Sequence, residues 1–236
     1  MANARIKRIV CLANSRKEGD RCIAGKELLR SGEPGAWVRP VSDREDEAVN
    51  ESERQYEDGA EPRLLDDREP KVLDVIDVPL HEARPKGYQQ ENWLLDPNRR
   101  WRRVACVGPN ALDRLAEPAG PLWINGYHTN LGRNDRLPLE RAGSLDGSLR
   151  LIRVGKLVLD VFAPRIEQGD FKRRIKGGFR HAGEDYRLWV TDPVCEHTYL
   201  NRPNDRYQLG ECYLTVSLGE PYQGYAYKLI AAIVEL

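Results

Sequence analysis

The sequence lacks any apolar run long enough to cross a membrane. A membrane helix needs about 20 consecutive apolar residues, whereas the first 14 residues contain only the short apolar run 9–13. We therefore expect no signal peptide and no contact with membranes.

Cysteine is also scarce, and its number is odd. The five cysteines (Cys11, Cys22, Cys106, Cys195 and Cys212) are irregularly spaced in a chain of 236 residues, which is long enough to bury its own core. A disulfide framework is therefore disfavoured. We expect a cytoplasmic protein with reduced thiols.

The chain has no net charge, because 37 Lys and Arg residues balance 37 Asp and Glu residues. This balance argues against tight, non-specific binding to duplex DNA. Lysine is the scarcer cation, with 9 residues against 28 arginines. Arginine suits phosphate, carboxylate and aromatic partners, but a GC-rich genome also raises its content, so the positions of the arginines must decide.

Several catalytic motifs are absent. The sequence contains no G-x-x-x-x-G-K-[ST] phosphate loop, G-x-G-x-x-G turn, G-x-S-x-G elbow or H-E-x-x-H pair. The common nucleotide hydrolases, dinucleotide enzymes and serine hydrolases are therefore disfavoured. Nothing in the sequence requires a cofactor.

Negative charge is concentrated in one stretch. Residues 43–69 contain 12 acidic residues and 4 arginines, with few apolar residues and no sustained period. We interpret residues 43–70 as an acidic surface insertion, with one short helix within 45–56.

Elsewhere, short runs rich in Val, Ile, Tyr and Trp alternate with Gly, Pro, Asn and Asp, which is typical of strands and turns. The predicted strands are 6–12, 21–28, 36–41, 72–80, 101–107, 149–154, 157–162, 171–176, 186–191, 211–218 and 225–234. The best helix candidate is 110–116, with Asn110 as its N-cap. The fold class is therefore all-β with minor helix.

Residues 6–41 and 157–193 share a rhythm of strand, polar turn, strand, turn and a Trp-Val strand. This rhythm suits two OB-like small β-barrels of about five strands each. We expect the first in residues 1–138, including the acidic insertion, and the second in 139–236.

Five segments carry a family resemblance: 11–17 (CLANSRK), 19–25 (GDRCIAG), 37–42 (WVRPVS), 88–93 (YQQENW) and 227–232 (YKLIAA). They resemble a bacterial family of dual OB-fold domains of unknown function. The resemblance covers most of the chain outside the acidic insertion. It implies two OB-folds and, through them, nucleic-acid binding, but it assigns no catalytic residue.

Residues 171–180 contain five cations and no acid: Lys172, Arg173, Arg174, Lys176 and Arg180, together with Phe179. In a strand over 171–176, period-two alternation places Lys172, Arg174 and Lys176 on one face. That face could follow a phosphate backbone while Phe179 stacks on a base. A sheet edge protected by charge is the alternative.

Two further clusters are candidate nucleic-acid contacts. The run 99–103 places arginines around one indole, and its candidates are Arg100, Trp101 and Arg102; a core Trp with solvated arginines is the alternative. The turn 14–21 offers Ser15, Arg16, Lys17 and Arg21, with Trp37 and Arg39 on a nearby strand. It joins the first two strands, where OB-folds bind ligands, although a plain charged hairpin explains it equally.

Catalytic signals are weak. Cys22 has basic neighbours in sequence, Glu91 lies in a polar patch, and Lys228 is a third candidate. His181, Cys195, His197 and Cys212 lack the paired spacing of a zinc site, so we predict no metal.

Three functions remain open. The first is a nucleic-acid-binding module for single strands with little sequence specificity. The second is a nucleotide- or nucleic-acid-processing enzyme with a groove between the barrels. The third is a regulatory module that contacts a protein partner through the acidic insertion.

Overall fold

The structure is a computed structural model that describes residues 5–17, 19–56, 69–164, 167 and 169–236. The chain forms two compact units, Met1–Leu115 and Ala116–Leu236. This division lies earlier than the expected one after residue 138. Strand β7 (Arg136–Pro138) pairs with β14 (Tyr225–Glu235), and therefore belongs to the second unit.

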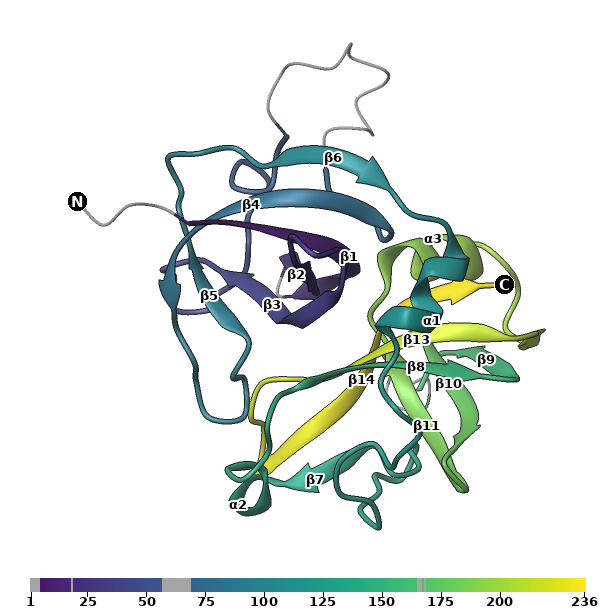
Figure 1. The fold of residues 1–236 in the computed structure, drawn as a ribbon. Helices are drawn as coiled ribbons and strands as arrows, with labels where there is room; N and C mark the ends of the chain where they lie inside the picture. Colours follow the sequence, from purple (N-terminus) through teal and green to yellow (C-terminus); the bar gives the residue numbers. More distant parts are fainter. Residues whose placement is uncertain (1–4, 18, 57–68, 165–166, 168) are drawn as a thin grey trace. The chain divides into compact units, whose positions relative to one another are not determined.

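The described residues of the first unit form one six-stranded sheet (Figure 1). Its strands are β1 (Arg5–Lys17), β2 (Asp20–Leu28), β3 (Pro34–Val41), β4 (Asp74–Ala83), β5 (Asn92–Leu95) and β6 (Arg102–Cys106). The order is β1-β2-β3-β5-β4-β6, with β3 parallel to β5. Because β4 also pairs with β1, five strands form a ring of pairings. A short 3₁₀ helix, η2 (Pro109–Ala111), and α1 (Leu112–Leu115) end the unit.

Alternation along the strands builds the core of this unit. Ile9 of β1 lies opposite Ile76 of β4, and both are buried in one core cluster with Cys11 and Val78. Gly25 of β2 lies so close to the backbone of β1 that an added Cβ would be 2.1 Å from the Val10 carbonyl oxygen. Only glycine therefore permits the pairing of β1 and β2 at this point.

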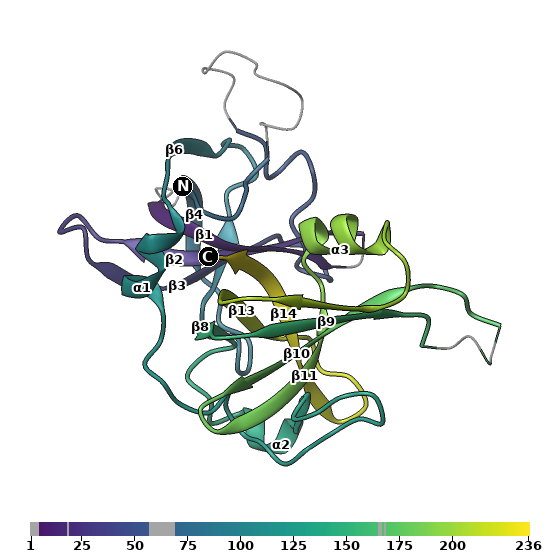
Figure 2. The ribbon, with the colours of Figure 1, turned by 90° about the vertical axis from the view of Figure 1, so that its right-hand side faces the viewer.

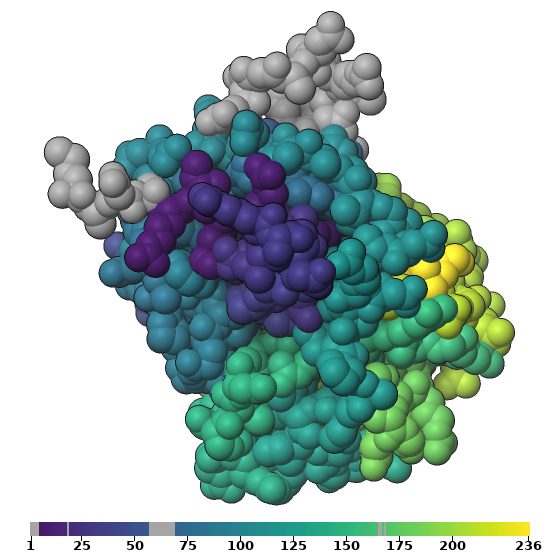
Figure 3. Space-filling model, in the orientation of Figure 1, coloured from purple at the N-terminus to yellow at the C-terminus, as the bar shows by residue number. Residues whose placement is uncertain are grey.

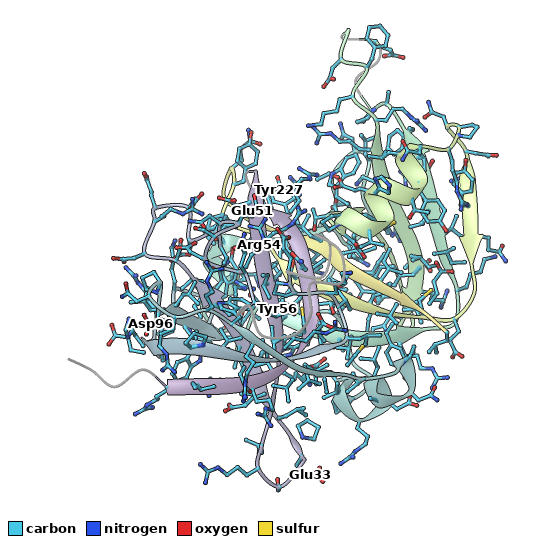
Figure 4. All side chains as sticks on the ribbon, turned by 90° about the horizontal axis from the view of Figure 1, so that it is seen from above. Glu33, Glu51, Arg54, Tyr56, Asp96 and Tyr227 are labelled. Atoms are coloured by element: carbon cyan, nitrogen blue, oxygen red, sulfur yellow. The ribbon has the colours of Figure 1, made fainter. Side chains whose placement is uncertain are left out.

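The described part of the acidic insertion is not purely solvated, contrary to the sequence expectation. Val49 and Tyr56 pack in the core, and the Tyr56 hydroxyl donates to Asp74 Oδ2 at 2.8 Å. Buried Arg54, labelled with Tyr56 in Figure 4, pairs with Glu69 at 3.1 Å. Residues 45–56 form turns rather than the expected helix. Residues 57–68 of the insertion lie outside the described residues.

The second unit contains the larger sheet. Besides β7 and β14, its strands are β8 (Leu149–Val154), β9 (Leu157–Phe162), β10 (Arg174–His181), β11 (Glu184–Val190), β12 (Arg206–Leu209) and β13 (Cys212–Leu218). The order is β12-β9-β10-β11-β14-β13-β8, with β11 parallel to β14. Its helices are α2 (Leu139–Ala142) and α3 (Pro193–Leu200), and α3 lies against the sheet (Figure 2).

The second unit also forms a ring of pairings, through two split strands. Strand β8 pairs with β13, and β9 pairs with β12, in one continuous register. The break at Gly155-Lys156 therefore faces the break at Gly210-Glu211. β8 and β9 together therefore correspond to one long strand, and β12 and β13 to another. Counted in this way, the second unit repeats the strand order of the first.

The all-β expectation is confirmed, and most predicted strands exist. The predicted strand 171–176 is wrong at its start, because β10 begins at Arg174. The sequence analysis did not predict β5, β7, β12, α2 and α3, of which only α3 had a clear signal. Asp192 caps α3 by accepting from the backbone N–H groups of Val194 and Cys195, with Pro193 at the first position. This is a standard helix start.

Candidate functional site

The outer face of β9, β10 and β11 gathers cations and aromatic rings. Successive strand residues point to opposite faces, and the alternate set Leu159, Ile175 and Leu188 packs in the core. The other set points away from the core. We call it the cation–aromatic face, and its members are Asp160, Phe162, Arg174, Lys176, Arg187 and Trp189.

Strand register brings these side chains together. Lys176 lies opposite Trp189 on β11 and opposite Asp160 on β9, while Arg174 lies opposite Phe162. The rings of Phe162 and Trp189 stack with centroids 5.9 Å apart and an interplanar angle of 16°. Both rings are half-buried.

Three cations surround this ring pair. Lys176 Nζ lies 4.1 Å from the centroid of Trp189, and Arg174 Cζ lies 5.9 Å from the same ring. Arg187 Cζ lies 5.6 Å from the ring of Phe162 and also pairs with Asp160. The half-buried guanidinium groups can contact phosphate while the rings contact bases.

Lys176 differs from the other two cations because it is fully buried. Its Nζ lies 3.7 Å from Asp135 Oδ2, which is longer than a hydrogen bond. Asp135 is itself buried and accepts from the backbone N–H of Thr129 at 2.8 Å. Burial lowers the pKa of Lys176 to about 8, against the opposing effect of Asp135. The expectation that Lys176 contacts phosphate directly therefore fails in this conformation.

The other residues of the basic stretch also separate. Phe179 is buried and stacks on Tyr186, so it offers no surface to a base. Arg173 donates to the carbonyl oxygens of Leu200 and Arg202, and thus fixes the chain after α3. In contrast, Lys172 and Arg180 are exposed, although Arg180 lies 3.7 Å from Asp185.

Trp101 is a core residue, which corrects its predicted role in stacking. Its side chain is fully buried in the first unit. The neighbouring guanidinium groups bind elsewhere: Arg100 donates to Gln55 at 2.9 Å, and Arg102 donates to Asp77 at 2.6 Å. The alternative interpretation, a core Trp flanked by solvated arginines, is correct.

The predicted turn 14–21 forms the hairpin between β1 and β2. Arg16 is exposed, Lys17 and Arg21 are half-buried, and buried Ser15 donates to the Cys22 carbonyl at 3.4 Å. Arg16 is therefore the most exposed of these four candidates.

Trp37 and Arg39 of β3 have different surroundings. Trp37 is half-buried, and Lys26 Nζ lies 5.6 Å from its ring. Arg39 is buried and pairs with Glu91 at 2.8 Å. Parts of β2 and β3, dark blue in Figure 3, are visible on the surface of the first unit.

The two units carry an equivalent Lys–Trp pair. Lys26 of β2 lies opposite Trp37 of β3, as Lys176 of β10 lies opposite Trp189 of β11. In both units these strands are the second and third members of the ring. In the second unit, the stacked ring of Phe162 adds to the Lys–Trp pair.

A family model for the dual OB-containing domain matches residues 7–233. The chain belongs to this family. The match spans both units, in agreement with two rings that share one strand order. No curated protein and no solved structure matches the sequence significantly.

In this dual OB-containing domain, each of the three catalytic candidates has different surroundings. Cys22 is half-buried, and the Glu91 carboxylate is held by Arg39. Lys228 Nζ donates to the Ile124 carbonyl at 2.9 Å and to Asn125 Oδ1 at 2.8 Å. Burial lowers the pKa of Lys228 to about 7, although Asp135 and Glu184 act in the opposite direction. These contacts explain Glu91 and Lys228 as supports of the fold.

Among the described residues, no group of three or more His, Cys, Asp or Glu side chains could hold a metal ion. Cys195 and Cys212 are buried thiols in the core of the second unit. Burial raises the pKa of Cys212 to about 11, which disfavours the thiolate that a metal needs. In the same described part of the dual OB-containing domain, no helix has the length and apolar character of a membrane span.

Phe162, Arg187 and Trp189 were missed as site residues, although their signal was present. In the run LVLDVF, Asp160 and Phe162 alternate with apolar residues, and in EDYRLWV, Arg187 and Trp189 do the same. The outward positions could thus be read from each strand. The sequence did not indicate that strand register places the outward residues of β9 and β11 on either side of β10.

Proposed function

We propose that this dual OB-containing domain binds single-stranded nucleic acid through the cation–aromatic face of its second unit. The carrying observation is the stacked pair Phe162–Trp189 with Arg174 and Arg187 beside the rings. Aromatic rings and cations on one sheet face suit exposed bases and a phosphate backbone without sequence preference.

The position of this face supports the proposal. OB-folds bind oligonucleotides on strands 2 and 3 and at neighbouring loops, and β10 and β11 hold those places in the second ring. Exposed Phe171 and Lys172 lie in the β9–β10 connection, and exposed Arg206 lies on β12 opposite Asp160. Together these residues extend the face toward a ligand backbone.

Zero net charge implies modest affinity. Four cations, namely Lys172, Arg174, Arg187 and Arg206, are the proposed phosphate contacts; of these, Arg187 also donates to Asp160 and to the Leu131 carbonyl oxygen. Four contacts with a single strand give a log–log salt slope near −3.

The five cysteines are free, which supports an activity in the cytoplasm.

Binding of labelled single-stranded DNA, single-stranded RNA and duplex DNA at about 50 and 200 mM salt tests the proposal. We expect single strands to bind with that slope and to quench Trp fluorescence. Trp189→Ala should weaken single-strand binding at least fivefold, because one stacking contact is lost. Trp37→Ala measures the share of the first unit. Failure of all three nucleic acids to bind at low salt would overturn the proposal.

A further inference from the structure

The cation–aromatic face continues along β14. Trp189 of β11 lies beside Leu229 of β14 in parallel register. Leu229, Tyr227 and Tyr225 are all half-buried and alternate with the buried residues of β14. They therefore point to the same side of the sheet as Trp189.

A tight hairpin brings a third tyrosine to the end of this row. Tyr222 and Tyr225 exchange backbone hydrogen bonds of 2.9 and 3.0 Å. Between them, Gln223 and Gly224 have φ values of 49° and 79°. Two positive φ values are typical of a type I′ turn, which joins strands closely. The turn leaves Tyr222 at 62% exposure.

One guanidinium accompanies these rings. Arg136 of β7 lies opposite Tyr227, and its Cζ is 4.0 Å from the centroid of Tyr225. The rings of Tyr222 and Tyr227 have centroids 6.3 Å apart. We call Tyr222, Tyr225, Tyr227 and Arg136 the tyrosine surface; Tyr227 is labelled in Figure 4. It combines aromatic rings with a cation, as the cation–aromatic face does.

We propose that the tyrosine surface is a second subsite for the same single strand. The inference depends on the proposed function, because the strand reaches this surface from Trp189. The row from Leu229 to Tyr225 spans five residues of β14, whose four steps cover about 13 Å. A short oligonucleotide on Trp189 and Phe162 does not fill this length, whereas a longer one does.

Two lengths of oligothymidine test the proposal on the full chain: about two nucleotides, one for each ring of the Phe162–Trp189 pair, and about twelve, which is within the range of OB-fold sites. Tyr222→Ala should weaken binding of the longer oligonucleotide about fivefold or more and leave the shorter one unchanged. Tyr222→Phe should retain both affinities, because the ring is kept. Val194→Ala, at an exposed position on α3, is the control for an unrelated surface substitution.

The outcomes separate this inference from the proposed function. If Trp189→Ala weakens both lengths while Tyr222→Ala and Tyr225→Ala change neither, the tyrosine surface is not a subsite but the proposed function stands. Equal losses at both lengths with Tyr222→Ala would also overturn the second subsite, since the tyrosines would then serve the first. If Trp189→Ala changes neither length, the proposed function itself fails.

Discussion

Among single residues, Lys176 shows most clearly how position changes a side chain's role. As a sequence letter it is one of five cations in a basic stretch. In the fold it is fully buried between Trp189 and Asp135, and its Nζ makes no hydrogen bond. Burial without hydrogen bonds disfavours the charged form of a lysine side chain. Lys176 therefore makes the stability of the protein depend on pH.

We expect Lys176→Met to change this pH dependence. Between pH 8 and the ordinary lysine pKa, the unfolded chain holds a proton that folded Lys176 has lost, so wild-type stability gains as pH rises. Below pH 8 both states are protonated and the contribution is constant. The free energy of unfolding of the wild type, relative to that of Lys176→Met, should thus increase by roughly 1 kcal/mol from pH 8 to 9.

Urea denaturation of both proteins at several pH values measures this difference. Comparing the two proteins cancels groups that titrate in both, such as the buried thiols. A constant difference from pH 7 to 9 would show that Lys176 has an ordinary pKa in the folded protein.

Between strands, close approach depends on particular glycines. Gly25 faces the β1 backbone, where an added Cβ would lie 2.1 Å from the Val10 carbonyl oxygen. Gly178 of β10 has room, because a Cβ there would be 3.8 Å from the Val158 carbonyl oxygen. These two positions are a matched pair for testing strand packing.

We expect Gly25→Ala to destabilise the protein by about 1–3 kcal/mol, because the backbone of β1 must move. Gly178→Ala should cost little, since the new methyl group makes ordinary contacts and restricts the unfolded chain. Chemical denaturation of the two variants checks both values. Equal stabilities would contradict the close approach at Gly25.

Neighbouring arginines at the start of β10 serve different elements. Arg173 holds the chain that follows α3 through two carbonyl oxygens and Asn204. Arg174 lies beside Trp189 on the outer face. Replacing either by Gln removes the same charge, so the two variants differ only in what each guanidinium contacts.

We predict that Arg173→Gln changes stability and that Arg174→Gln changes nucleic-acid binding. The first should lower stability by about 1 kcal/mol, because hydrogen bonds to a charged group are lost, and should change nucleic-acid affinity little. The second should leave stability unchanged and reduce the salt slope by about 0.7, as one phosphate contact is lost. Chemical denaturation measures the effect on stability, and salt titrations of binding measure the effect on the salt slope. An equal loss of affinity in both variants would indicate a general charge effect.

For the whole molecule, each unit has its own ring of paired strands and its own core. The second unit also contains every residue of the cation–aromatic face and the tyrosine surface. We therefore expect a fragment of residues 116–236 to fold alone and to bind single strands. Near-ultraviolet circular dichroism and the titrations above check this. A fragment that folds but does not bind would place essential contacts in the first unit.

Local patterns in the sequence determined the elements of this protein. Alternation and turn residues predicted β8 and β9 at their observed bounds, and the repeated Trp-Val strand indicated two similar halves. Side-chain period and turn chemistry act over a few residues, so they can be read from the chain. The Asp-Pro start of α3 was equally local and was available to the same reasoning.

The tertiary structure alone decided which residues share a surface. Trp101 stands among four arginines in sequence and Trp189 has only Arg187 within two residues, yet Trp101 is fully buried and Trp189 stacks on Phe162 at a half-buried face. Strand register joins residues far apart in the chain, and burial depends on what covers them, so neither is a property of local sequence. The sequence therefore determined the strands and the supply of cations and rings, and the fold determined which of them meet.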